Sequence, residues 1–459
     1  MSATGVAPRE SKTTRDWTKG SVFGNLLLLS WPMVIMEGLW SVSQVVDMIW
    51  VGRLGAVSMA GVGMANIVVM LVMSVDMGLL VGVRAMIARH MGAGDLRAAS
   101  HVAGQAVLLA ASWGVIVTLL GVLLARPVLG LFHLEGDVLR EGVAYTQVLF
   151  AGWASMELLI FGLYSLQASG DTLTPMIVEA AIRSVHLALC PFLVMGWWLF
   201  PQLGVRGAAL SNVIAQVLGA VTVVWILFGG RGRLRPVVRD LVFAPRIVWR
   251  ILKIGVPALV MNLQSSAGSI ALVGLIVSFG TLAVASHSVA SRLEMFLLVP
   301  GMGLGAGAGV LVGHNLGAGR PARASRGAWL AVGIVEAFML AWCLAILLFA
   351  EAVFGVFSRD PELVRLGADF LRIAAVSYLV VALSAVLQNC IAGAGDTLPN
   401  MIISIAGVWV VQLPLAFALS RFTSLGVYGV RWAMVAAVVA TATAYTAYFW
   451  TGRWKSKAV

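Results

Sequence analysis

Charged side chains are scarce in this chain of 459 residues. They make up 11% of the sequence, whereas hydrophobic residues make up 60%, and the mean hydropathy is +0.96. An ordinary soluble domain carries about 25% charged residues, so the composition excludes a soluble globular fold. The sequence therefore predicts an all-α integral membrane protein.

Cysteine is also rare, and the motifs of common catalytic centres are missing. Cys190, Cys343 and Cys390 lie in apolar stretches without the CxxC or Cys/His spacing of a zinc or redox site. We therefore expect no metal site and no bound cofactor. No DDxxD, HExxH or nucleophile-elbow motif occurs either. The chain is predicted not to be an enzyme, and an intramembrane prenyltransferase or metalloprotease is disfavoured.

What the sequence does contain is a series of long apolar runs. A membrane-spanning helix needs about 20 mostly apolar residues, and twelve runs meet this requirement. An even number of spans places both termini on one side of the membrane. The runs lie near residues 22–51, 57–83, 101–125, 142–167, 174–199, 205–229, 251–279, 281–311, 327–351, 365–390, 399–420 and 426–450.

Basic residues are distributed unevenly over the loops between these spans. Of the 31 Lys and Arg residues, 19 fall on the face that carries the termini and 8 on the opposite face. The positive-inside rule then predicts a multi-pass protein of the cell inner (plasma) membrane with both termini cytoplasmic. The net charge of +11 reports this orientation, so no nucleic-acid partner is expected.

The spans and loops divide the chain into five predicted parts. The longest loop mixes arginines with apolar residues, a pattern that suits a helix lying on the anionic inner leaflet. The parts are a cytoplasmic N-terminal tail (1–21), an N-terminal six-helix lobe (22–229), a basic cytoplasmic linker (230–250), a C-terminal six-helix lobe (251–450) and a cytoplasmic C-terminal tail (451–459).

The second half of the chain resembles the first at one constant offset. This offset aligns Pro32 with Pro257, and Gly92-Ala93-Gly94 with Gly317-Ala318-Gly319. A constant offset indicates two duplicated units, and six spans in each unit give both units the same orientation in the membrane. The sequence predicts two parallel six-helix repeats with a substrate cavity near the midplane. The glycines of the paired motifs are expected to end helices with positive φ.

Few ionisable groups lie inside the spans, and each is informative because a charge at the centre of a membrane helix costs roughly 2.5–3.5 kcal/mol. Asp47 is a candidate for coupling or substrate binding, with an ion pair to Arg53 as the alternative. His186 can exchange a proton near neutral pH, or can be a satisfied polar residue. Glu157 could complement a cationic substrate or pair with a neighbouring helix. Asp76 is interpreted as a structural partner of Arg84.

Several motifs together resemble the multidrug and toxic compound extrusion (MATE) family of transporters, and they cover nearly the whole chain in the same order as in that family. In character the sequence is most similar to the proton-coupled DinF-type branch. The motifs are Pro32 followed by DMIWVGRLG (47–55), GLLVG…HMGAG (78–94), ASGDTLTPM (168–176), ASHSVASRLE (285–294), GLGAG…NLGAG (303–319) and GAGDTLPNM (393–401).

The resemblance implies an antiporter that exports cationic or amphipathic compounds. In the proton-coupled branch, a first-helix acid works with an Asn and an Asp on the fifth helix, and the first helix bends at its proline. Asp47 and Pro32 fit these roles, while His186 and Cys190 stand at the Asn and Asp positions.

Members driven by sodium carry an acid on the seventh helix. Here Pro257, which would bend that helix, is followed by Asn262 and Gln264 and by no carboxylate. The proton-coupling or substrate-binding candidates are therefore Asp47, His186, Glu157, Cys190, Asn262 and Gln264, and the helix-bending candidates are Pro32 and Pro257.

The leading hypothesis is an exporter driven by inward proton flow, working as a monomer on a small organic cation or amphipathic compound among membrane lipids. Sodium-coupled antiport is one alternative. A flippase for lipid-linked precursors is another, which favours an Arg-rich cavity and more than twelve helices. A major-facilitator transporter is disfavoured because its acidic-arginine signature after the second span is replaced by RHMGAGD (89–95).

Overall fold

The computed structural model describes residues 15–198, 200–230, 232–357 and 360–457, and these residues form long helices with short connections. Ten of the spans in the described residues are each assigned as one α-helix, of which Pro321–Gly355 is kinked at Phe349. They are α1 (Val22–Gly52), α2 (Ala56–Gly92), α3 (Leu96–Gly130), α6 (Leu173–Met195), α7 (Val205–Phe228), α8 (Pro245–Val277), α9 (Thr281–Gly317), α10 (Pro321–Gly355), α11 (Pro361–Gly393) and α14 (Val427–Thr451).

Two further spans are interrupted. One consists of α12 (Thr397–Ile405), a π-helical segment η2 (Ala406–Gln412) and α13 (Leu413–Phe422). The other is a pair, α4 (Gly136–Ala151) and α5 (Trp153–Ala168), bent by 52° at Gly152. Counted as one span, this pair brings the total among the described residues to twelve, and the predicted number of spans is confirmed.

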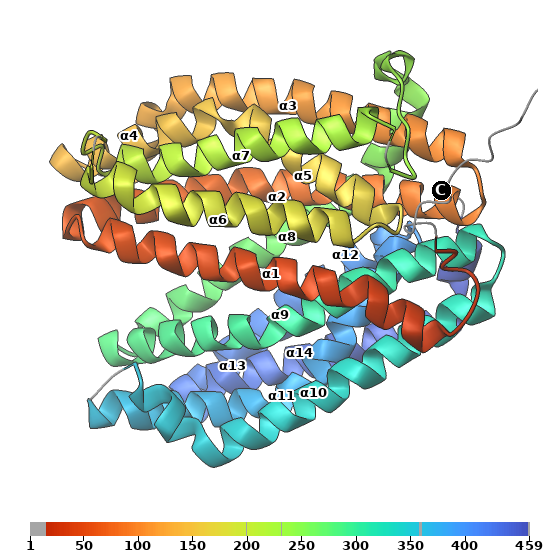
Figure 1. Ribbon diagram of the computed structural model, residues 1–459. Coiled ribbons are helices and arrows are strands. Elements are labelled where there is room, and N and C mark those ends of the chain that lie inside the picture. The colour runs from red at the N-terminus through yellow and green to blue at the C-terminus, as the bar shows by residue number, and fades with distance from the viewer. Residues whose placement is uncertain (1–14, 199, 231, 358–359, 458–459) are drawn as a thin grey trace, which may run out of the picture.

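The helices gather into two bundles. Helices α2 to α7 occupy the upper part of Figure 1, and α9, α10, α11, α13 and α14 occupy the lower part, with α1 and α8 running between them. The bundles converge at the end where the C-terminus is marked and diverge at the other end. Below, these are called the terminal end and the far end. This is the predicted two-lobe arrangement.

The two halves meet through contacts that repeat the offset found in the sequence. Helix α2 packs on α8, and α1 packs on α9. A Cβ atom at Gly78 would lie 2.6 Å from Leu259 Cβ, and one at Gly303 would lie 2.6 Å from Val34 Cα. The offset that aligns the two halves matches Gly78 with Gly303 and Val34 with Leu259, so the two contacts are equivalent. The lobes are therefore related by a pseudo-twofold axis, as expected for parallel repeats.

The glycines at the ends of α2 and α9 have two different roles. Both helices end where predicted, at Gly92 and Gly317, but the positive φ angles lie two residues later, 78° at Gly94 and 68° at Gly319. Gly92 and Gly317 instead allow the two helices to cross. A Cβ atom at Gly92 would overlap the carbonyl oxygen of His314. Small residues permit such close approach of membrane helices.

The linker between the lobes differs from the predicted membrane-surface helix. Helix α8 begins at Pro245, and among the described linker residues before it only Val238–Leu241 is helical, as one 3-10 turn. The linker is held on α3, because Gln105 donates to the carbonyl oxygens of Asp240 and Val242 at 2.6 and 2.7 Å. The pattern of arginines and apolar residues was misleading because tertiary hydrogen bonds satisfy this backbone without a helix.

An ion pair fixes the same turn. Arg97 makes two hydrogen bonds of 2.7 Å to the Asp240 carboxylate, whose side chain is almost fully buried. Burial opposes ionisation of Asp240, but the hydrogen bonds from Arg97 and from the Val237 N–H outweigh it and hold the pKa of this carboxyl below its usual range. A depressed pKa in the folded state stabilises the fold at neutral pH, and this stabilisation is lost as the pH falls through that pKa.

We expect Asp240→Asn to lower the melting temperature of the purified protein by a few degrees at pH 7, because Arg97 and the Val237 N–H lose a charged acceptor. The difference between variant and native protein should shrink as the pH is lowered toward 3. Thermal melts in detergent across this range measure it. Asp137→Asn is the matched control, since its pair with Arg140 is exposed on both sides and should contribute little. Equal melting curves at pH 7 for Asp240→Asn and native protein would contradict the assignment.

Candidate functional site

Asp47 and His186 meet where α1 packs on α6. Nε2 of His186 lies 3.1 Å from Oδ1 of Asp47, although the ring nitrogen is not aligned for a straight hydrogen bond. The histidine side chain is 1% exposed, and the aspartate side chain is 27% exposed. One partner is therefore enclosed by the N-terminal lobe, while the other remains partly exposed.

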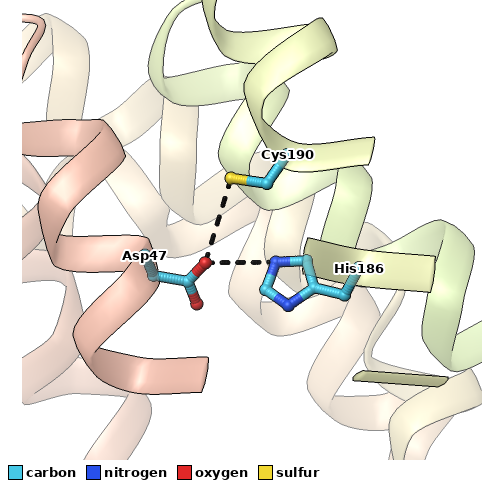
Figure 2. A group of neighbouring side chains, drawn as sticks. All are labelled: Asp47, His186 and Cys190. Carbon is cyan, nitrogen blue, oxygen red and sulfur yellow. Dashed lines mark hydrogen bonds and ion pairs between the residues drawn. The ribbon is translucent and has the colours of Figure 1, made fainter. Parts of the chain in front are cut away.

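Two neighbours complete this group. Cys190 lies one helical turn after His186 on α6, and its Sγ is 4.0 Å from Asp47 Oδ1, so the imidazole and the thiol approach the same carboxylate oxygen (Figure 2). On the other side of the ring, Ser43 Oγ lies 3.2 Å from His186 Nδ1. If the serine hydroxyl donates to Nδ1, the ring proton is placed on Nε2, facing Asp47.

A polar stripe of Glu179, Arg183, His186 and Cys190 runs along one face of α6, and its first two members pair with each other. Arg183 Nε donates to Glu179 Oε1 at 2.7 Å, as the four-residue spacing indicates. The guanidinium of Arg53 stacks over the ring of Trp50, 4.5 Å from its centroid, and His186 is the side chain that lies beside Asp47.

The same group has donor atoms that could hold one cation. The carboxylate oxygen of Asp47, a ring nitrogen of His186 and Sγ of Cys190 all lie within 4.8 Å of one another. Only one of these three donors is oxygen, the ligand that hard cations such as sodium prefer, whereas all three can bind a proton. The chemistry of the donor set therefore favours proton exchange over sodium binding.

Glu157 lies in a different cluster. It is completely buried on α5, where Trp153 Nε1 donates to its Oε1 at 2.8 Å. Asp76 on α2 is its neighbour, and Trp113 Nε1 donates to Asp76 Oδ1 at 2.7 Å. Asp76 is thus not the partner of Arg84, whose guanidinium donates to Ala306 O.

The two polar candidates on α8 lie in the C-terminal lobe. Gln264 donates to Ser404 Oγ at 2.8 Å and accepts from Trp409 Nε1 at 3.1 Å, so it joins α8 to the interrupted span. The π-helical segment carries Trp409. Asn262 is half-buried on the same helix. These residues are not assembled with Asp47, and they form a polar surface of the other lobe.

Pro32 and Pro257 occupy equivalent places in the two lobes. Each lies inside a continuous helix, α1 or α8, and the offset between the repeats aligns them. Proline cannot donate a backbone hydrogen bond and so weakens a helix at this point. Both helices lie at the contact between the lobes. A bend in either helix would therefore change how the lobes meet.

Sequence reasoning missed one buried ion pair. Arg431 is one of the 8 basic residues that the sequence places in loops of the face opposite the termini, yet it is 2% exposed, and its Nη1 lies 3.0 Å from Glu294 Oε1. Its guanidinium also stacks over Phe370, 4.8 Å from the ring centroid. The one signal in the sequence was Glu294, which lies on the span near 281–311. A carboxylate buried in a span requires a partner, so this acid indicated that a basic residue lies near it.

The model of the MatE family matches residues 32–192 and 257–418, which together exceed two thirds of the chain. The chain belongs to the MatE family. The two matched segments begin at Pro32 and at Pro257, which are equivalent positions of the two halves, so the family model recognises both repeats. As a MatE protein the chain is a transporter and not an enzyme, and the resemblance seen in its motifs is confirmed.

Two curated relatives and one solved structure show how far this similarity extends. The chain is 28% identical over 444 residues to the "Probable multidrug resistance protein NorM" of Thermotoga maritima, covering 95% of this chain and 93% of the relative. It is 24% identical over 371 residues to the "FAD transporter" of Shewanella oneidensis, covering 81% and 82%. A solved structure described as MATE in the bent conformation has a TM-score of 0.89 at 25% identity, covering 96% and 97%.

These relatives establish the general activity of this MatE protein. It is a multi-pass membrane transporter of the compound-extrusion type, and its two-lobe fold is that of solved MATE structures.

Proposed function

We propose that this MatE protein is an antiporter that exports cationic or amphipathic compounds and is driven by inward proton flow. The observation that carries the proposal is the contact between Asp47 and His186, 3.1 Å apart, with only the aspartate open to its surroundings. An ionised Asp47 attracts a cation, and a proton bound to the same group removes this attraction. Substrate and proton then compete for one carboxylate, which is sufficient for exchange.

Protonation at Asp47 can change the shape of α1. Pro32 precedes Asp47 on this helix by about four turns, or about 22 Å along the helix axis. Helix α1 contacts both α6 of its own lobe and α9 of the other lobe. The solved relative is described in a bent conformation, and we propose that neutralising Asp47 weakens its hold on His186 and lets α1 bend at Pro32.

We further propose an orientation in which the terminal end is cytoplasmic. The excess of Lys and Arg in the loops of that face supports it. Arg431 is buried and so does not belong to the loops of the opposite face, which makes the excess larger. The far end, where the bundles diverge, then faces outward.

Since one chain contains both lobes, we propose that the monomer is the working unit. We also propose that the chain is divided into the five predicted parts, including a linker near 230–250.

Substrate would enter between the lobes and meet polar groups of both. Asn262 and Gln264 are proposed to supply neutral hydrogen-bonding groups from the C-terminal lobe, while Asp47 supplies charge from the N-terminal lobe. The twelve spans among the described residues support an exporter over a lipid-linked-precursor flippase, which favours additional helices.

Transport of a fluorescent organic cation in proteoliposomes tests this proposal. We expect an imposed pH gradient to drive transport with sodium absent, and a sodium gradient at equal pH to drive none. His186→Gln should slow proton-driven transport because the proton-bearing partner of Asp47 is replaced by a neutral amide. His101→Gln, on α3 near the terminal end, is the matched control and should leave the rate unchanged. Transport driven by sodium alone would contradict proton coupling.

A further inference from the structure

A second pair of ionisable groups lies inside the N-terminal lobe, away from Asp47. Asp76 on α2 and Glu157 on α5 are 1% and 0% exposed. One oxygen of each carboxyl accepts from an indole, Asp76 Oδ1 from Trp113 and Glu157 Oε1 from Trp153. Each carboxyl is therefore fixed in place by a tryptophan and kept away from water.

The other oxygen of each carboxyl has no such partner. Asp76 Oδ2 and Glu157 Oε2 are buried and accept no hydrogen bond from any residue that the structure describes. The two carboxyl groups lie within hydrogen-bonding reach of each other. Two adjacent buried carboxylates repel each other, and neither can donate. One proton between them supplies the missing donor for both free oxygens.

Other charged groups do not take over this role. In the described part of the chain, no Lys or Arg forms an ion pair with Asp76 or Glu157. The titratable and charged groups on the surrounding helices have other neighbours. The groups and their neighbours are Glu37 with Arg84, Asp47 with His186 and Tyr145, Tyr164 with Arg84, Glu179 with Arg183, and Glu294 with Arg431.

The backbone around the pair shows why it stays dry. The 52° bend at Gly152 starts α5 at Trp153 and thereby places Glu157 one turn later. Helix α3 presses against the same turn, since a Cβ atom at Gly114 would lie 3.2 Å from Glu157 Cγ. Two residues after Asp76, α2 makes its close contact with α8 of the other lobe at Gly78. The pair is thus enclosed on one side and adjoins the contact between the lobes on the other.

We propose that Asp76 and Glu157 form a second proton-binding site, in which one proton shared by the two carboxyl groups is taken up and released in each transport cycle. In the conformation seen here the shared proton joins α2 to α5. Movement of α2 against α8 separates the carboxyl groups and releases the proton. The inference rests on the proposed proton-driven transport and adds one proton to the number exchanged for each substrate.

The shared proton can be tested without transport. A protonated carboxyl has an infrared C=O stretching band that a carboxylate lacks. We expect the native protein at pH 7 to show such a band and Glu157→Gln to lose it, while Glu179→Gln, on the internally paired α6 stripe, retains it. The amide introduced by Glu157→Gln offers an oxygen to Trp153 and an N–H to Asp76, so this variant should keep the native melting temperature. An unchanged infrared spectrum in Glu157→Gln would overturn the shared proton.

The transport role is tested by the substrate gradient reached at equilibrium. One proton moving down a gradient of one pH unit supplies about 1.36 kcal/mol, or about tenfold in the substrate ratio. We therefore expect Glu157→Gln to reduce the maximum ratio about tenfold under that gradient while transport remains proton-driven. A ratio equal to that of the native protein would overturn the exchange. If the native protein itself shows no dependence on the pH gradient, the proposed function fails, whereas the infrared result still decides the shared proton.

Discussion

Asp47→Asn should lower the substrate accumulation that a gradient of one pH unit supports by about tenfold. If each substrate is exchanged against a proton at Asp47, a gradient of one pH unit supports about tenfold accumulation through that proton. The asparagine cannot bind a proton at its amide oxygen, so this contribution disappears. The amide also leaves His186 without the carboxylate that lies beside its Nε2. Measuring the fluorescent cation in proteoliposomes at a clamped membrane potential gives the ratio directly.

The variant is expected to fold, because Asp47 is 27% exposed and an amide has nearly the same size. Asp137→Asn is a suitable control, since it alters an exposed acid at the far end of the same lobe and should leave accumulation unchanged. Exchange of labelled substrate at equal concentrations should persist in Asp47→Asn at a reduced rate. Full accumulation in this variant would remove Asp47 from the coupling mechanism.

Gly92→Ala should weaken the contact between the lobes at the terminal end. The added methyl group would overlap the carbonyl oxygen of His314, and backbone atoms cannot move aside as a flexible side chain can. Overpacking of this kind costs about 1–3 kcal/mol. Its symmetric partner Gly317 meets Arg89 O in the same way. Separation of α2 from α9 relieves the overlap, so conformations open at this end should become more populated.

A cysteine introduced at Ala318 reports this opening, because the three native cysteines are buried. We expect Gly92→Ala to increase its labelling by about tenfold, the population change that corresponds to about 1.4 kcal/mol. The melting temperature should fall as well. Gly63→Ala, also on α2, is the control, since a Cβ atom there would meet no other atom within 4 Å. Equal labelling in both glycine variants would show that the crossing does not hold this end closed.

Properties encoded in local composition could be predicted from the sequence. Each span is recognisable because about 20 apolar residues are needed to cross the hydrocarbon core, whatever the neighbouring helices are. The duplication was visible for a similar reason, since Pro32 and Pro257 or Gly92 and Gly317 keep one offset along the chain. The linker shows the limit. Its mixture of arginines and apolar residues predicted a surface helix, but Gln105 and Arg97 of α3 hold the backbone in another form.

The partners of the polar residues depended on the tertiary structure. The sequence identified Asp47 and His186 as candidates, but they lie on helices far apart along the chain, and only the rotation and packing of α1 against α6 bring them to 3.1 Å. Hydropathy does not report which face of a helix meets which neighbour. For this reason Asp76 was paired with Arg84 on its own helix, whereas the bend at Gly152 brings Glu157 to it. The apolar runs therefore determined the twelve spans, the constant offset determined the two repeats, and helix packing decided which of the scarce charges meet.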